Sequence, residues 1–232
     1  MAKLTEPCVE ASAIEHLKQF YSSKHKTETI YAKSQAYTIP KYNGIADGFL
    51  CFHSQKQTFH SVSIEAKSYK TLMNLKPFVN YDKLILHVLL TAVVIGISVT
   101  FFNWRFEWYW LLLLFLGISI ASFFIMGLPL DKYEPDRYKT ADVVSQISRY
   151  PANEKWIAIS SDSVNLLRNR KPYIIRGCSY ENLFKICQRK GIGLVLVNHL
   201  SPNIVLYPKF RKGKFLNCYN FSREVEAHIS QS

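Results

Sequence analysis

Hydrophobic side chains follow three different patterns along the chain, and each pattern predicts a different kind of element. Two uninterrupted runs, Leu84 to Phe102 and Trp108 to Leu128, are long enough to cross the roughly 30 Å hydrocarbon core of a bilayer as helices. Elsewhere apolar residues recur at helical spacing, as in Glu6 to Lys24, or alternate with polar ones, as in Thr58 to Lys67. The chain is therefore predicted to combine a membrane segment with an α/β part.

The two hydrophobic runs predict a transmembrane helical hairpin over residues 84–128. The short connection at 103–107 is rich in aromatic residues, which favour the membrane interface. Lysine and arginine cluster outside the runs, at 67–83 and 132–139, whereas the connection contains only Arg105. By the positive-inside rule we expect a two-pass protein of the cell inner membrane with both termini cytoplasmic. A buried hairpin in a soluble protein is the less favoured alternative, because the runs contain almost no polar residue.

Upstream of the hairpin, the pattern predicts one helix and two paired strands. The helix extends from Glu6 to about Lys24, and the strands are Ile45 to His53 and Thr58 to Lys67. Residues 27–42 show no clear period, so we expect an irregular strand or loop there.

Downstream of the hairpin, helices and strands alternate. We expect helices at 136–150 and 179–190, buried strands at 155–160 and 193–197, and edge elements at 203–207 and 214–219. Residues 1–80 and 131–220 would then be two halves of one domain, a mixed sheet flanked by helices, interrupted by the hairpin at 84–128. Residues 221–232 would form a tail.

Charge and cysteine usage narrow the classes of function. The formal net charge is +12, and almost none of it lies in the hydrophobic runs, so the soluble part is basic. Such a surface suits nucleic acid or anionic lipid, although it also serves solubility and topology. The five cysteines are scattered without a C-x-x-C, which argues against a disulfide framework and a zinc site. Residues 1–18 contain no apolar segment typical of a signal peptide, so we expect none.

The candidate chemistry lies on the two predicted strands before the hairpin. Asp47 ends the segment Gly44-Ile45-Ala46-Asp47, and the next strand ends in Glu65-Ala66-Lys67. Side chains alternate along a strand, so Glu65 and Lys67 share a face, and Asp47 can reach the same place from the neighbouring strand. Carboxylates in such a position can hold Mg²⁺, with Mn²⁺ as an alternative. We expect Asp47, Glu65 and the Ala66 carbonyl to be metal ligands, and Lys67 to orient the attacking water and stabilise negative charge.

Three more polar residues complete a set of candidate site residues that follow one another in a characteristic order along the chain. Glu15 lies on the first helix, and Gln146 and Tyr150 lie one turn apart on the helix after the hairpin. Together with Gly-x-x-Asp and Glu-Ala-Lys, this order resembles the PD-(D/E)xK superfamily of restriction-endonuclease-like nucleases, in particular its RecB-like branch. The resemblance implies a restriction-endonuclease-like sheet in which Glu15 supports the metal through a water, while Gln146 and Tyr150 position the site. A membrane hairpin between Lys67 and Gln146 departs from the usual plan of that superfamily.

The resemblance implies an Mg²⁺-dependent nuclease, an endonuclease or other phosphodiesterase acting on DNA in preference. Anchored by the predicted hairpin, such an enzyme could meet foreign DNA as it enters, so we expect a role in antiviral defence. A basic segment with interleaved aromatic residues would contact nucleic acid through Lys209, Arg211, Lys212 and Lys214, or else form a solvated basic turn near the anionic leaflet. Two alternatives stay open: an inactive nuclease fold that binds nucleic acid or a partner of a defence system, and a membrane effector that forms homo-oligomers through small residues of its hairpin.

Overall fold

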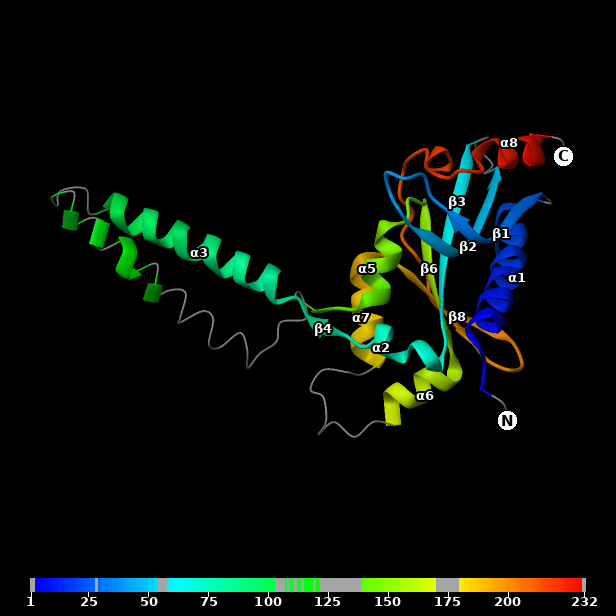
Figure 1. The fold of residues 1–232 in the computed structure, drawn as a ribbon, viewed down its shortest axis with the longest axis horizontal. Coiled ribbons are helices and arrows are strands. Elements are labelled where there is room, and N and C mark those ends of the chain that lie inside the picture. The colour runs from blue at the N-terminus through cyan, green and yellow to red at the C-terminus, as the bar shows by residue number, and fades with distance from the viewer. Residues whose placement is uncertain are drawn as a thin grey trace. The chain divides into compact units, whose positions relative to one another are not determined.

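The computed structural model describes residues 3–230 except 28, 54–57, 103–106, 108, 111, 114, 119, 122–138 and 170–179. The chain divides into two compact units. The first unit contains Met1–Pro77 together with Ala141–Ser232, and the second contains Phe78–Thr140. Each unit is described separately below (Figure 1).

A mixed sheet forms the centre of the first unit. In the described part it has six strands in the order β1-β2-β3-β6-β7-β8, of which β3, β6 and β7 are parallel and the remaining pairs antiparallel. The prediction of an α/β fold with a mixed sheet is confirmed. The strands are β1 (Ile30–Tyr37), β2 (Ile45–His53), β3 (Phe59–Lys67), β6 (Glu154–Ser160), β7 (Gly193–Val197) and β8 (Pro202–Leu206).

One face of the sheet is covered by α1 (Glu6–His25), as Figure 1 shows. The helix has a proline in its first turn, where a backbone N–H would have no intrahelical acceptor, so the N–H that proline lacks costs no hydrogen bond. Its buried side chains recur every four residues and pack on alternate residues of β3 and on Trp156 of β6. The stripe consists of Val9, Ala13, Leu17 and Tyr21.

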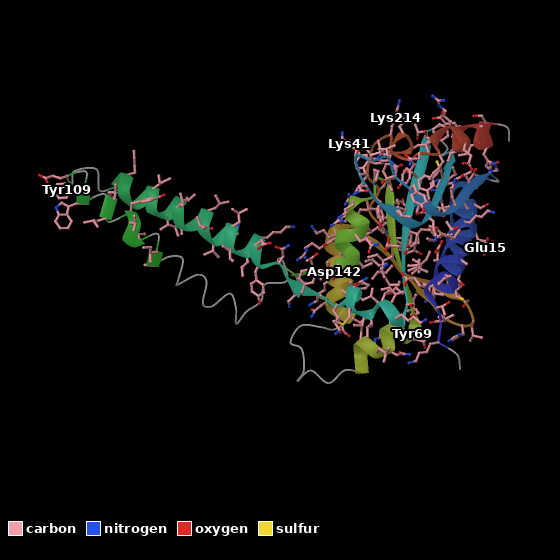
Figure 2. All side chains as sticks on the ribbon, in the orientation of Figure 1. Glu15, Lys41, Tyr69, Tyr109, Asp142 and Lys214 are labelled. Atoms are coloured by element: carbon pink, nitrogen blue, oxygen red, sulfur yellow. The ribbon has the colours of Figure 1, made fainter. Side chains whose placement is uncertain are left out.

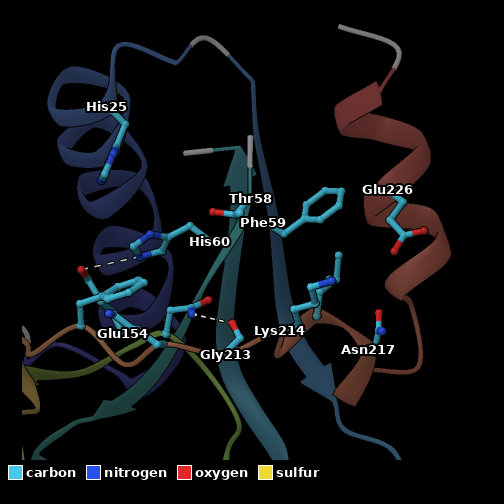
Figure 3. A pocket seen from close by; sticks show the side chains of 13 residues that line it. His25, Thr58, Phe59, His60, Glu154, Gly213, Lys214, Asn217 and Glu226 are labelled. Atoms are coloured by element: carbon cyan, nitrogen blue, oxygen red, sulfur yellow. Dashed lines mark hydrogen bonds and ion pairs between the residues drawn. The ribbon is translucent and has the colours of Figure 1, made fainter. Parts of the chain in front are cut away.

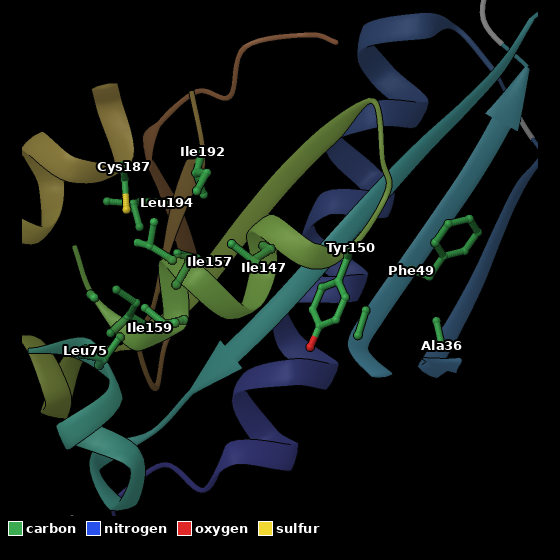
Figure 4. Packing of buried hydrophobic residues seen from close by; sticks show 14 of the residues in the cluster. Ala36, Phe49, Leu75, Ile147, Tyr150, Ile157, Ile159, Cys187, Ile192 and Leu194 are labelled. Carbon is green, nitrogen blue, oxygen red and sulfur yellow. The ribbon is translucent and has the colours of Figure 1, made fainter. Parts of the chain in front are cut away.

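The opposite face holds the larger core (Figure 4). There the apolar faces of the helices after residue 140 pack on the inward-facing side chains of β6 and β7. Ile147, Ile157 and Leu194 illustrate this contact between helix and sheet. The helices after residue 140 are α5 (Asp142–Arg149), α6 (Ser161–Asn169), α7 (Tyr180–Lys190) and α8 (Ser222–Ser230), with the 3-10 turn η3 (Leu216–Cys218). The turn η1 (Tyr69–Thr71) and the short helix α2 (Leu72–Leu75) follow β3, and α2 adds Leu72 and Leu75 to the same core.

Several elements differ from the sequence prediction. Residues 30–37 form the regular edge strand β1, whose pairing with β2 is hard to see in the sequence because an edge strand is only partly buried. The expected tail forms α8, which buries Val225 and Ile229 against the core. The helix expected at 136–150 begins only at Asp142, and α6 was not predicted.

The second unit contains one long apolar helix in its described part, α3 (Tyr81–Phe102), with β4 (Phe78–Val79) paired to β5 (Lys139–Thr140). Within α3, Tyr81–Ser98 is long and apolar enough to cross a membrane, and 22% of that window is buried. A single such helix is weak support for a membrane location. Of the second hydrophobic run, residues 109–110, 112–113, 115–118 and 120–121 are helical, and the rest lies outside the described residues, as do residues 132–138.

Candidate functional site

The antiparallel pairing of β2 and β3 brings the start of one strand beside the end of the other. Gly48 is the register partner of Ile64, so Asp47 lies next to the Glu65-Ala66-Lys67 segment. Val62, Ile64 and Ala66 face the core under α1. Glu65 therefore points to the opposite face of the sheet, as the alternation along the strand predicted.

Three charged side chains meet at this end of the sheet. The ammonium nitrogen of Lys67 lies 2.6 Å from Glu65 Oε1 and 3.8 Å from Asp47 Oδ2. The Ala66 N–H donates a hydrogen bond of 2.7 Å to the same Asp47 oxygen. Glu65 and Lys67 are buried, whereas a quarter of the Asp47 side chain is exposed. Asp47, Glu65 and Lys67 are called the charged cluster below.

The electrostatics of the charged cluster favour a cation. Burial, and then the charge of Asp47, raises the pKa of Glu65 to about 7, although Lys67 opposes the shift. Burial also raises the pKa of Asp47, which the Ala66 N–H and Lys67 partly offset. Burial alone would lower the pKa of Lys67, but the surrounding carboxylates outweigh it and raise that pKa. Two carboxylates that resist ionisation together are stabilised when a further positive charge joins them.

The helix α5 brings the predicted Gln146 and Tyr150 to the charged cluster. Tyr150 is buried, and its hydroxyl interacts with both Gln146 and Glu65. Burial, followed by the nearby charge of Glu65, raises the pKa of this phenol, so it stays a hydrogen-bond donor at neutral pH. The ring lies against Gly44, where an added Cβ would come within 2.7 Å of Tyr150 Cε1. The glycine of Gly-x-x-Asp therefore makes room for the tyrosine.

The structure does not bring Glu15 to the charged cluster. Its side chain is exposed on α1 (Figure 2) and accepts a hydrogen bond of 3.1 Å from Gln19. Two other carboxylates of the same helix, Glu6 and Glu10, interact with the charged cluster instead. Glu6 Oε1 lies 3.2 Å from the Lys67 ammonium nitrogen. Burial, and then the charges of Asp47 and Glu6, raises the pKa of Glu10 to about 6.

Sequence reasoning missed Glu6 and Glu10 because it took Glu15, the acidic residue in the middle of the predicted helix. The usable signal was helical spacing: Glu6 and Glu10 are four residues apart and share one face, which Glu15 does not.

The predicted nucleic-acid segment lies away from the charged cluster. The backbone N–H of Arg211 donates to the Asn153 carbonyl, and that of Lys209 donates to the Gly191 carbonyl, both just before parallel strands begin. Glu65 and Lys67 are near the end of β3. Figure 2 shows Lys214 and Tyr69, which follows β3, at opposite ends of the first unit. Lys209, Arg211, Lys212 and Lys214 therefore do not line the approach to the charged cluster.

A cavity of about 770 Å³ opens beside the tyrosine instead. Gly44, Gln146 and Tyr150 contribute to its wall, and Asn43 and Arg149 extend the wall with polar groups. Arg149 is exposed, so its guanidinium is available to an anion entering this cavity.

The residues of the charged cluster fit a hard divalent cation in part. Glu65 Oε2 is buried and has no hydrogen-bond partner among the described residues, which leaves one carboxylate oxygen for a metal. Mg²⁺ is commonly held by one or two carboxylates while waters and phosphate oxygens complete its shell. Within the described ranges, no group of three or more His, Cys, Asp and Glu side chains is placed to hold a metal ion by itself. The arrangement thus suits a cation shared with substrate.

Comparison of this chain with family models, with curated proteins and with solved structures gave no match.

Proposed function

We propose that the protein is a metal-dependent phosphodiesterase of the PD-(D/E)xK type that cleaves nucleic acid, with DNA as the favoured substrate. The observation that carries the proposal is the convergence of Asp47, Glu65 and Lys67, with an unpaired Glu65 oxygen, at adjacent strand ends. The order of these residues in the sequence and the nearby Gln146 and Tyr150 support it.

Each residue has a chemical part to play. Asp47 and Glu65 would hold Mg²⁺, which supplies charge neutralisation at the phosphate and a more acidic water. Lys67 would orient that water and stabilise negative charge on the phosphate, since its ammonium group already lies between the carboxylates. Tyr150 and Gln146 would fix the orientation of Glu65. Glu6 would hold Lys67 in place through its 3.2 Å ion pair.

The cavity beside Tyr150 supports a nucleic-acid substrate. Its polar wall and the exposed Arg149 suit a phosphate backbone, to which a protein of charge +12 is attracted over long range. Cleavage of foreign DNA in antiviral defence fits such an enzyme and is part of this proposal.

The test is cleavage by the full chain purified in detergent. Supercoiled plasmid and a structured RNA are incubated separately with Mg²⁺, with Mn²⁺ or with EDTA. We expect metal-dependent cleavage that is lost in Glu65→Gln and in Lys67→Met. Lys70→Ala serves as a matched control, because Lys70 is an exposed lysine only three residues away.

Folding of the two variants is checked by thermal unfolding, so that loss of activity is not confused with loss of structure. Cleavage that persists in both folded variants, or in EDTA, would contradict the proposal. Folded wild-type protein that cleaves neither substrate with either metal would also contradict it, and would favour an inactive nuclease fold.

We further propose that α3 anchors the protein in a lipid bilayer. Leu89 and Val94 are 49% and 61% exposed on this helix, although both are apolar. Arginine at either position would face the hydrocarbon at a cost of about 3 kcal/mol each. The double variant Leu89→Arg/Val94→Arg should leave the membrane fraction after alkaline extraction, whereas the wild type should stay. Release of the wild type would contradict anchoring.

A further inference from the structure

A second cavity, of about 990 Å³, opens where β3 and β6 begin, at the end of the sheet opposite Lys67 (Figure 3). Residues from α1, β3, β6, α8 and the segment after β8 line it. Its volume falls within the range of small-molecule sites, roughly 300–1,000 Å³. The charged cluster and the proposed cleavage do not involve this cavity.

Two imidazole nitrogens in its wall are buried without a hydrogen-bond partner among the described residues. His60 and Glu154 are each about 5% exposed, and His60 Nε2 is 3.6 Å from Glu154 Oε1, too long for a hydrogen bond. His60 Nε2 and His25 Nε2 have no hydrogen-bond partner among the described residues. Leaving such a group buried and unpaired costs about 1–3 kcal/mol, a cost that a bound ligand would relieve.

The Glu154 carboxylate is held in place from behind. The Tyr21 hydroxyl donates to Glu154 Oε2, and the Trp156 indole N–H donates 2.8 Å to the Tyr21 oxygen. This chain of donors satisfies one carboxylate oxygen and leaves Oε1 facing His60. The result is a fixed acceptor beside an imidazole that can donate or accept.

Aromatic rings and lysines complete the cavity. Phe59 and Phe210 line it, and Phe210 lies 5.2 Å from the His60 ring while remaining 55% exposed. Lys212 and Lys214 are exposed on the same wall and outnumber the one exposed carboxylate, Glu226. A flat ring can stack on the aromatic side chains while an attached anion meets the ammonium groups.

Hydrogen bonds to Asn153, the residue before β6, hold the segment that carries Lys212 and Lys214 in place. The Asn153 side-chain amide donates to the carbonyls of Arg211 and Gly213, at 2.8 and 3.0 Å. The Asn153 carbonyl accepts 2.8 Å from the Arg211 N–H. A wall that is already ordered loses little conformational freedom when a ligand binds.

We propose that this cavity binds a small anion that carries a flat nitrogen-containing ring, of the nucleotide class. The edge of the ring faces His60 and Glu154, its plane packs against Phe210, and its phosphate lies near Lys212 and Lys214.

The test is isothermal titration of the full chain in detergent with AMP, GMP, CMP and UMP, with adenosine, and with inorganic phosphate. We expect at least one mononucleotide to bind, and its Kd to rise about tenfold or more in Lys212→Ala/Lys214→Ala. The matched control is Lys70→Ala/Lys209→Ala, which removes the same charge from two exposed lysines outside the cavity. Phe210→Ala should weaken the binding of the mononucleotide but not the binding of phosphate.

Four results would overturn the proposal. One is that none of the mononucleotides binds at millimolar concentration. A second is that phosphate binds as tightly as the best mononucleotide, and a third is that the cavity double variant binds like the control. The fourth is that a short single-stranded oligonucleotide, titrated in the same way, binds much more tightly than any mononucleotide with the same dependence on Lys212 and Lys214, which would assign the wall to a strand. Binding in the Glu65→Gln variant tests independence from the cleavage site, and we expect it to be unchanged.

Discussion

The two ends of the central sheet differ in whether a buried ionisable group has a close partner of opposite charge. At the end of β3, Glu65 and Asp47 share the Lys67 ammonium group, which contacts both within 4 Å. At the start of β3, His60 and Glu154 are equally buried, yet no strong ion pair joins them. Burial lowers the pKa of His60 to about 4, so its imidazole is neutral near pH 7, and burial also raises the pKa of Glu154, a shift that the Tyr21 hydrogen bond and Lys24 partly offset.

The difference shows what keeps a buried group charged. A carboxylate in a protein interior stays ionised only when a cation or several donors compensate its lost hydration. Lys67 provides this charge at one end, and the chemistry proposed there needs it. At the other end a neutral imidazole and a hydrogen-bonded carboxylate offer a donor and acceptors, which suits recognition of a ring and not cleavage.

The largest expected effect separates the two ends by activity. Asp47→Asn should lower Mg²⁺-dependent cleavage by about 10³, since a lost metal ligand removes several kcal/mol of transition-state stabilisation. Glu154→Gln makes the same chemical change at the other end and should leave the rate within about twofold. Initial rates of plasmid cleavage measure both. Equal losses in two folded variants would mean that the ends do not act separately.

The second prediction concerns the hydrogen bonds by which Asn153 holds the segment after β8 at the cavity end of the sheet. Asn153 is buried, and its side chain accepts from the N–H and hydroxyl of Ser61 and donates to two carbonyls. Asn153→Ala should therefore lower the free energy of unfolding by about 2–4 kcal/mol, at about 1 kcal/mol per hydrogen bond. Urea unfolding measures the change.

Asn217→Ala, at an exposed residue of the same cavity, is the control for that measurement and should cost less than about 0.5 kcal/mol. A similar loss in both variants would show that Asn153 does not fasten the segment after β8.

The elements that sequence reasoning located are those with a strong, regular burial pattern. The strand β7 matches its predicted bounds, and α1 and β3 differ from theirs by a residue, because each has one face fully in a core. At β1 the sequence predicted only an irregular strand or loop, because the burial of this strand depends on pairing with β2 and on α8, which lies far away in sequence. Such partly exposed elements take their structure from long-range contacts.

The candidate site could be predicted as far as it depends on strand alternation. Asp47, Glu65 and Lys67 meet because neighbouring antiparallel strands fix their register, which sequence pattern reveals. The choice of Glu15 over Glu6 and Glu10 failed because a helix can rotate about its axis without changing its apolar stripe by much. The cavity at His60 was not foreseen, since its residues come from five separate elements.

The third prediction uses pH at the charged cluster. Folding raises the pKa of Glu65 from 4.5 to about 7, so its ionisation is harder in the folded protein. The stabilisation from this group is complete below about pH 4.5 and is lost as pH rises to about 7. Glu65→Gln should remove this slope, on the order of 2 kcal/mol. Urea unfolding without metal, compared between the two proteins from pH 4 to 8, measures it, and parallel curves would contradict it.

The fourth prediction is the opposite slope at the cavity end. Burial, with the charges of His25 and Lys24, lowers the pKa of His60 from 6.5 to about 4. The neutral imidazole is accommodated above pH 6.5, and stability is lost as pH falls from 6.5 toward 4. His60→Phe keeps the ring that stacks on Phe52 and removes the titration. It should flatten the acid side of the profile by on the order of 2 kcal/mol; an unchanged acid slope would show that His60 is solvated.

The smallest expected effect tests which helix carboxylate belongs to the charged cluster. Glu10 interacts with the charge of Asp47, whereas Glu15 is exposed and accepts a hydrogen bond from Gln19. Glu10→Gln should change the cleavage rate about threefold and shift the acid limb of its pH profile, because the pKa of Glu10, about 6, falls within the working range. Glu15→Gln should leave both the rate and the profile unchanged. If Glu15→Gln altered the profile and Glu10→Gln did not, the face of α1 assigned to the charged cluster would be wrong, and with it the placement of Glu6 beside Lys67.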